Sequence, residues 1–92
     1  MPNVGIVISN YNGWQDTVQC LESLQKQTYR DFEIILLDDA STNDSVQQLH
    51  KHLPDNAVFL PQAANIGFAA ANNVGMRRAL ADGCDWVLLL NN

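Results

Sequence analysis

The 92-residue sequence lacks the features of several common protein classes. It has no basic excess, since five Lys and Arg against ten Asp and Glu give a formal charge of −5. A protein that binds a nucleic-acid backbone needs a basic face, so we expect no nucleic-acid partner. The sequence also has no apolar run near the ~18 residues that cross a bilayer, and no signal-peptide pattern at its N-terminus. We expect a cytoplasmic chain, or, for a longer protein, one at the inner face of the membrane.

Common metal-binding and phosphate-binding signatures are missing as well. Cys20 and Cys84 form no CxxC pair, which predicts reduced thiols in the core or on a helix face. His50 and His52 lie two residues apart, so they do not share a helix face and are expected to be solvated. No GxGxxG follows the first apolar run, and no GxxxxGK[ST] occurs anywhere. These absences disfavour a dinucleotide-binding Rossmann domain and exclude a P-loop.

Apolar runs alternate with helical patterns along the whole chain. Runs at residues 4–8, 32–37, 57–60 and 86–90 predict strands, and the segments 16–27, 42–53 and 68–81 predict helices. The last helix is rich in small residues, and Gly83 suits the position after its end. The predicted caps are Asp16 with Gln19, Ser41 or Thr42, and Asn65. Alternation of this kind predicts an α/β fold, a three-layer Rossmann-like parallel sheet of about four strands and three helices.

Polar clusters follow each predicted strand, at residues 9–12, 38–39, 65–67 and 91–92. Parallel α/β sheets bind ligands outside the carboxyl ends of their strands, so these clusters predict one site. Asp38 and Asp39 either occupy a helix-entry loop or supply a carboxylate that accepts a ligand N–H, such as the imide of uracil or thymine. A receiver-type phosphorylation site is disfavoured because its acidic pair follows the first strand. Tyr11 is either a lid over the core or a ring that stacks on a base.

Four further residues have open or structural interpretations. Asn72 and Asn73 lie inside a predicted helix, where asparagine is a poor helix former. Either one of them faces a polar partner, or both are solvated. Trp14 and Trp86 are predicted to serve mainly in packing.

Five segments together resemble one known family. Residues 4–12, 20–29, 32–42, 65–75 and 88–92 closely resemble family 2 glycosyltransferases of the GT-A fold. The resemblance covers nearly the whole chain, and five motifs in the right order make it specific. It implies that residues 1–92 are the N-terminal nucleotide-binding part of a truncated GT-A domain, of the nucleotide-diphospho-sugar transferase type.

The resemblance also implies roles for individual residues. The loop at residues 9–12 would hold the base, with Tyr11 near the ring. Asp39 would read the base edge, and Asp38 would support the same pocket. Residues 65–68 and the following helix would line the nucleotide and sugar side. The implied nucleotide-binding set is Ser9, Tyr11, Asn12, Asp38, Asp39, Asn65 and Gly67.

The end of the fourth strand would begin a DxD-type motif, whose last Asp binds Mn²⁺ or Mg²⁺ and through it the diphosphate. That metal acts as a Lewis acid on the leaving group. Here the first two positions are Asn91 and Asn92, and the third would be residue 93. The two asparagines look like a rhamnosyltransferase-type branch, which implies a deoxysugar donor such as dTDP-rhamnose.

The implied function is transfer of a sugar, with inversion, from a UDP- or dTDP-sugar to a saccharide or lipid-linked acceptor. The family's catalytic base and acceptor region would lie beyond residue 92, so no catalytic residue is assigned and the chain alone is expected to be inactive. A different class stays open: a non-catalytic α/β module that binds nucleotides or self-associates through an exposed edge strand.

Overall fold

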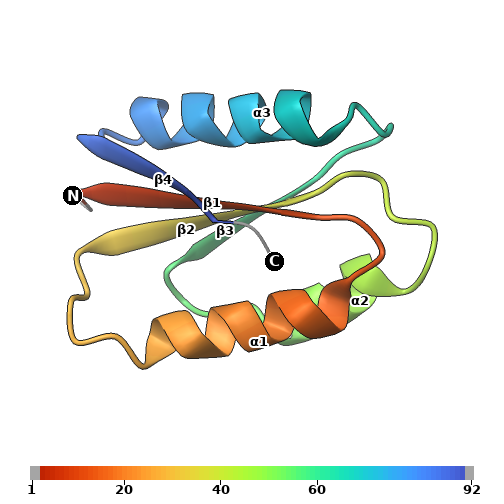
Figure 1. Cartoon of the computed structure of the whole chain (residues 1–92), viewed down its shortest axis with the longest axis horizontal. Helices are drawn as coiled ribbons and strands as arrows, with labels where there is room; N and C mark the ends of the chain where they lie inside the picture. The colour runs from red at the N-terminus through yellow and green to blue at the C-terminus, as the bar shows by residue number, and fades with distance from the viewer. Residues whose placement is uncertain (1–2, 91–92) are drawn as a thin grey trace.

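The computed structural model describes residues 3–90, in which strands and helices alternate along the chain (Figure 1). The elements are β1 (Val4–Asn10), α1 (Trp14–Gln25), β2 (Phe32–Asp38), α2 (Ser45–Lys51), β3 (Ala57–Pro61), α3 (Phe68–Ala81) and β4 (Trp86–Leu90). The strands form one parallel sheet in the order β3-β2-β1-β4. The predicted α/β architecture, with four strands and three helices in the described residues, is confirmed.

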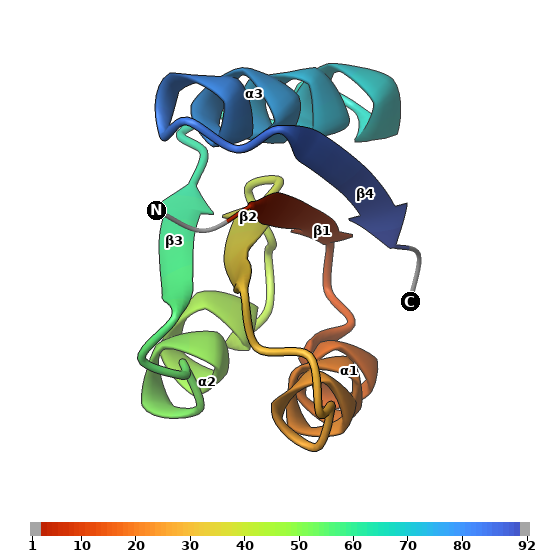
Figure 2. The same cartoon turned by 90° about the vertical axis from the view of Figure 1, so that its left-hand side faces the viewer.

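The sheet lies between two helical layers. Helix α3 covers one face, and α1 and α2 cover the other (Figure 2). Successive side chains of a strand point to opposite faces, which divides the apolar runs between the two layers. Ile6 and Ile34 pack with the α1–α2 layer, whereas Val7 and Ile35 pack in the cluster under α3. The two central strands are therefore apolar at nearly every position, as expected when both faces are buried.

Helix α3 packs closely on the sheet because a glycine lies at each of two contacts, one on β1 and one on the helix. A Cβ placed on Gly5 of β1 would lie 2.6 Å from the Cβ of Ala79. A Cβ on Gly75 of α3 would overlap the Val7 side chain and lie 2.8 Å from Leu37. The small residues predicted for this helix thus set its distance from β1 and β2, and they bring its first residues to the ends of those strands.

The first two helices begin at different residues from those predicted. Helix α1 starts at Trp14, after Gly13, so Asp16 lies in its first turn and is not its cap. There its carboxylate still interacts favourably with the positive end of the helix dipole. Helix α2 starts at Ser45, after Asp44. Ser41 does not cap it because it lies four residues before the helix, where its hydroxyl donates to the Asp38 carboxylate at 2.6 Å and accepts from the Asn12 N–H at 2.9 Å.

Helix α3 spans the predicted residues, and its two ends are set by glycine. It begins after Gly67, which has φ 88°, and Asn65 accepts a hydrogen bond from the Gly67 N–H without capping the helix by its side chain. At the other end Gly83 also has φ 88°, as predicted for the residue after the C-cap. Positive φ is a conformation that glycine adopts without the steric penalty of a Cβ.

Both cysteines are free, and Cys84 is buried. Burial raises the pKa of each thiol, which keeps it protonated and unreactive. Trp14 packs against the core and its ring stacks on His52 at 6.2 Å. Trp86 does not pack as predicted, since it is 69% exposed on the edge strand β4. Within residues 3–90, no helix is long and apolar enough to cross a membrane.

Candidate functional site

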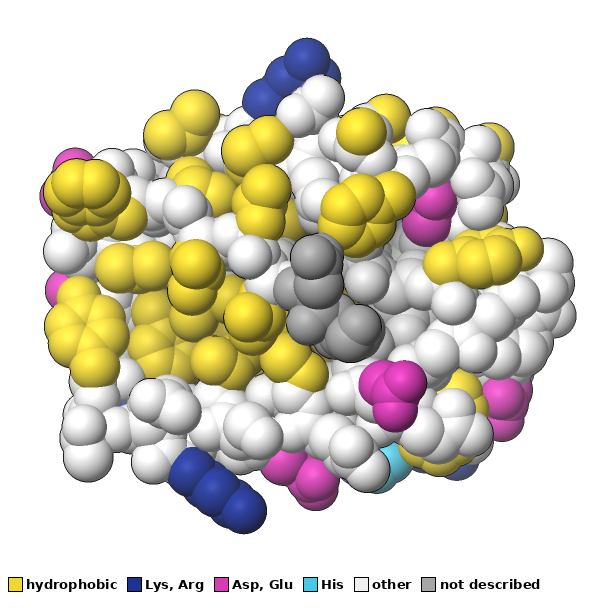
Figure 3. Space-filling model, viewed as in Figure 1, with side chains coloured by type: hydrophobic (Ala, Val, Ile, Leu, Met, Phe, Trp, Pro, Cys, Tyr) yellow, Lys and Arg dark blue, Asp and Glu magenta, His cyan; other side chains and the backbone are white. Residues whose placement is uncertain are grey.

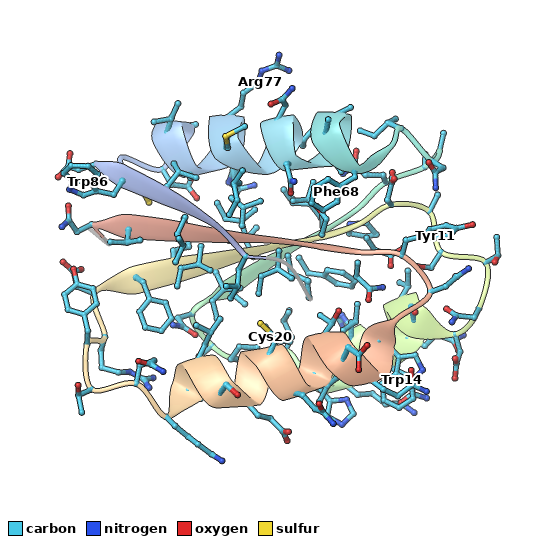
Figure 4. The ribbon with its side chains drawn as sticks, viewed as in Figure 1. Tyr11, Trp14, Cys20, Phe68, Arg77 and Trp86 are labelled. Carbon is cyan, nitrogen blue, oxygen red and sulfur yellow. The ribbon has the colours of Figure 1, made fainter. Side chains whose placement is uncertain are left out.

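A pocket of about 240 Å³ opens where β1 and β2 end and α3 begins. Figure 4 shows two of its aromatic side chains, Tyr11 and Phe68, at this end of the molecule. The lining residues are Ser9, Asn10, Tyr11, Asp39, Asn65, Gly67 and Phe68. The structure therefore brings together five of the residues predicted from sequence: Ser9, Tyr11, Asp39, Asn65 and Gly67.

Asp39 is the charged group in the pocket wall. It is 5% exposed, and its two carboxylate oxygens accept hydrogen bonds from the backbone N–H groups of Ile66 at 2.8 Å and Gly67 at 3.0 Å. Its own N–H donates to the Asn10 carbonyl at 2.9 Å. A carboxylate has about four acceptor positions. Asp39 thus fixes the entry to α3 and still has acceptor capacity for a ligand.

Asp38 does not line the pocket, and its predicted role in supporting that pocket stays a prediction. Its side chain is 0% exposed. Its carboxylate accepts from the Asn10 side-chain amide at 2.9 Å and from the Ser41 N–H at 2.9 Å. Adjacent residues of a strand point to opposite faces, so only one of the two aspartates can face the pocket. Asp38 supports the loops from beneath.

Asn10, which the sequence analysis included only as part of the loop at residues 9–12, is the centre of this buried network. It is 2% exposed, accepts from the Thr17 hydroxyl at 2.7 Å and donates to Asp38. Its position as the last residue of β1 joins that strand to both α1 and β2. The sequence did contain a signal for this role: a polar residue directly continues an apolar strand. An amide buried at such a position needs hydrogen-bond partners.

Asn12 also lies outside the pocket lining, and its predicted role in holding the base stays a prediction. Its side-chain oxygen accepts from the N–H groups of Thr42 at 2.8 Å and Asn43 at 3.2 Å. Asn12 and Ala40 both have positive φ, 56° and 57°, a conformation that asparagine tolerates and that is unfavourable for alanine. Each lies next to a pocket residue, Tyr11 or Asp39. The hydrogen bonds of Asn12 therefore hold the two loops together in the backbone conformations that place those side chains.

Ser9 and Asn72 connect the pocket to α3. The Ser9 hydroxyl donates to the side-chain oxygen of Asn72 at 2.8 Å, and Asn72 is buried whereas Asn73 is exposed. Of the two alternatives open from sequence, a polar partner for one of the amides is the one observed. Tyr11 is 52% exposed, so it is not a lid on the core. Its ring is available to a ligand in the pocket.

The predicted metal-motif residues, Asn91 and Asn92, lie outside the described residues. Within residues 3–90, no group of three or more His, Cys, Asp or Glu side chains is placed to hold a metal ion. The described part of the chain therefore does not supply a ligand set for the expected Mn²⁺ or Mg²⁺.

A larger groove, of about 680 Å³, lies between α2 and β3. Its walls include Val46, Leu53 and Phe59, with His50 and Lys51 at the side. No carboxylate or cluster of buried polar groups points into it, and it lies beside an outer strand. We assign the site to the smaller pocket because it combines fixed polar groups with the carboxyl ends of adjacent parallel strands.

A family model and several known proteins match most of this chain in sequence. The family model described as "Glycosyl transferase family 2" matches residues 5–92. The glycosyltransferase GlyG of Streptococcus pneumoniae serotype 4 is 39% identical over 75 residues, which cover 79% of this chain and 25% of GlyG. The chondroitin synthase of Escherichia coli is 35% identical over 79 residues, covering 84% of this chain and 11% of the synthase. The chain thus spans about a quarter or less of the length of these relatives.

Two solved structures share the fold. One is the mannosyltransferase PcManGT from Pyrobaculum calidifontis in complex with GDP-Man and Mn²⁺, with a TM-score of 0.77 at 24% identity over 85% of this chain and 24% of that one. The other is TarS residues 1–349 from S. aureus, with a TM-score of 0.80 at 24% identity over 97% of this chain and 27% of that one. At this identity the likeness establishes the GT-A type of fold.

Proposed function

The chain belongs to glycosyl transferase family 2, and we propose that the pocket at the ends of β1 and β2 binds the base of a UDP- or dTDP-sugar donor. The observation that carries this proposal is the place of Asp39. Its carboxylate is held in the pocket wall by two backbone N–H groups, beside the exposed ring of Tyr11. An aromatic face and a fixed acceptor together suit a planar ring that carries an N–H donor.

The proposed specificity follows from hydrogen-bond chemistry. An ionised carboxylate only accepts, and the imide N–H of uracil or thymine only donates, so the two are complementary. Cytosine has an unprotonated nitrogen at that ring position. Its lone pair would face the Asp39 carboxylate without a proton between them, which leaves a buried acceptor unsatisfied. We therefore expect the site to favour UDP and dTDP over CDP.

In the whole protein we propose that the bound donor gives its sugar, with inversion, to a saccharide or lipid-linked acceptor. The described residues contribute binding and orientation of the nucleotide. The support for a divalent metal is the Mn²⁺ in the similar mannosyltransferase structure, and such an ion would stabilise the charge of the leaving diphosphate. The two terminal asparagines still favour a deoxysugar donor of the dTDP type. No residue of this chain is assigned as the catalytic base.

Isothermal titration calorimetry tests the proposal on the chain, with and without Mn²⁺. We expect UDP and dTDP to bind and CDP to bind about tenfold more weakly or worse, the loss typical of an unpaired polar group in a site. GDP is a further arm, because its guanine also presents N–H donors and the similar mannosyltransferase was solved with GDP-Man. Equal binding of UDP and CDP, or preference for GDP, would reject the pyrimidine-imide assignment.

The matched variants are Asp39→Asn and Asp55→Asn. Asp55 is an exposed aspartate in the turn before β3, away from the pocket. Asp39→Asn removes the charge and one acceptor, and should abolish the preference for UDP over CDP. Asp55→Asn should leave both affinities as in the wild type. If Asp39→Asn retained the wild-type preference, another group would have to read the base.

An exposed edge strand favours a second function, self-association. Figure 3 shows hydrophobic side chains gathered on the face that carries β4, and Trp86, Leu88 and Leu89 of this strand are all exposed. An unprotected strand edge with apolar side chains pairs readily with a second copy. Light scattering after size-exclusion chromatography should then give a dimer mass that Trp86→Lys with Leu88→Lys reduces to a monomer. A wild-type monomer at high concentration would contradict this function.

A further inference from the structure

Phe68, the first residue of α3, lies at an exposed position rather than in the core. It is 59% exposed, and it belongs to neither of the two apolar clusters that form the core. A phenylalanine ring is a large apolar surface, and leaving it in water gives up the stabilisation that burial would provide. The position of Phe68 therefore contributes little to the packing of the chain.

The same ring lines the pocket that contains Asp39 and Tyr11. Tyr11 comes from the loop after β1 and Phe68 from the start of α3, so the two rings enter the pocket from different elements (Figure 4). Tyr11 is likewise about half exposed. Two large aromatic side chains thus remain in solvent beside one buried carboxylate.

The backbone that carries Phe68 is fixed, and Asp39 fixes it. The Asp39 carboxylate accepts from the N–H groups of Ile66 and Gly67, the two residues just before Phe68. The Gly67 carbonyl then accepts the first helical hydrogen bond from the Ala71 N–H at 2.9 Å. Gly67 has φ 88°, a backbone conformation that residues with a Cβ rarely adopt, so the turn favours glycine at this position. The backbone of Phe68 is therefore held at a set place relative to the carboxylate that we expect to read the base.

We propose that Phe68 is a specificity-determining residue that packs its ring against the nucleobase, so that the base contacts aromatic side chains from both the loop after β1 and the start of α3. This inference rests on the proposed function and goes beyond it: the sequence analysis assigned stacking on the base to Tyr11 alone and placed the residues around Phe68 on the nucleotide and sugar side in general. Base–aromatic stacking tolerates different bases, because every base has a π-face. Phe68 accordingly selects for the presence of a base, whereas Asp39 selects among bases.

The test compares ligands with and without a base on matched variants. UDP and inorganic pyrophosphate are titrated into the wild type, Phe68→Ala, Phe68→Tyr and Leu80→Ala by calorimetry. Leu80 is a fitting control, because it lies on the same helix, is 62% exposed and does not line the pocket. Loss of a stacking side chain should weaken UDP binding by about tenfold in Phe68→Ala. Phe68→Tyr should stay within about twofold of the wild type, because it keeps the ring.

Pyrophosphate binding should be the same in all four proteins, since it has no base to stack. If the wild type binds UDP and Phe68→Ala binds it equally well, the role of Phe68 is refuted while the proposed function stands. An equal loss for UDP and pyrophosphate in Phe68→Ala would also refute it, because the ring would then act on the phosphate side or on the fold. If the wild type binds no nucleotide, both proposals fail together. Unchanged thermal midpoints of the variants, expected for exposed side chains, show that binding losses are local.

Discussion

Replacing Glu33 by glutamine should remove a pH-dependent cost from the stability of this fold. Glu33 lies in β2, at the end of the sheet opposite the pocket, and its buried Oε2 atom accepts no hydrogen bond. Burial, followed by a side-chain hydrogen bond with Asp82 and repulsion from it, raises the Glu33 pKa from 4.5 to about 7, and Arg78 partly offsets this. Arg78 itself pairs with Asp82 at 3.1 Å. Protonated Glu33 can donate to Asp82, whereas ionised Glu33 repels it.

The direction of the pH dependence follows from whether Glu33 is protonated in the folded and in the unfolded chain. Below pH 4.5 Glu33 is protonated in both the folded and the unfolded chain, and its contribution to stability is fully present. Between pH 4.5 and about 7 the unfolded chain releases this proton and the folded chain keeps it, so stability falls as pH rises. At about 1.36 kcal/mol per pKa unit the ceiling is about 3 kcal/mol. Because Glu33 is only partly buried, water screens the charge, and we expect about 1 kcal/mol.

The assay is urea unfolding followed by tryptophan fluorescence from pH 5 to pH 8.5, a range above the sequence pI of about 4.5, where the uncharged chain would aggregate. The free energy of unfolding of Glu33→Gln, minus that of the wild type, should increase by about 1 kcal/mol across this range. Glu22→Gln, on the exposed face of α1, is the control and should show a flat difference. A flat difference for Glu33→Gln as well, or one that decreases with pH, would refute the reasoning.

Three further substitutions test the packing around the pocket, each by its urea unfolding midpoint and derived free energy. Gly75→Ala should destabilise the chain by about 1–3 kcal/mol, because the added methyl overlaps Val7. The control Asn73→Ala, on the exposed face of α3, should be neutral or slightly stabilising. Equal free energies of unfolding for the two variants would contradict close packing at Gly75. Asn10→Ala should cost about 2–3 kcal/mol, since it removes a donor from the buried carboxylate of Asp38; a loss under about 0.5 kcal/mol would mean that water replaces the amide. Gly67→Ala should cost about 1 kcal/mol or more because of its positive φ, and it should weaken UDP binding too; unchanged stability would show that the turn relaxes.

The strands and the last helix were predictable because their signals are local. The apolar runs of β1 and β2 mark strands buried on both faces, and the small residues of α3 mark a helix that packs closely. The predicted and observed bounds of α3 and β4 are the same. Helix starts were less predictable, since several residues near each start are able to cap. Ser41 was a good cap by its type, but its hydroxyl bonds to Asp38 instead.

The parts of the site that sequence did not give depend on contacts between distant segments. Strand alternation separates Asp38 from Asp39, but which of them faces the pocket depends on the face that α3 covers. The side-chain partners of Asn10 lie on α1, on β2 and in the loop after β2, up to 31 residues away. The Asp39 carboxylate likewise accepts hydrogen bonds from Ile66 and Gly67, which follow it by 27 and 28 positions in the chain. Pairings at such separations are properties of the folded sheet rather than of any local pattern.

The most direct test of the account is a backbone-amide NMR titration of the isotopically labelled chain with UDP. Binding at the proposed site should shift the amide signals of residues 9–12, 39–40 and 66–68, because these surround the pocket and its loops. The signals of residues 46–53, along the larger groove beside β3, should stay in place. Saturable shifts confined to that groove, or no saturable shift at all, would contradict the claim that the ends of β1 and β2 bind a nucleotide.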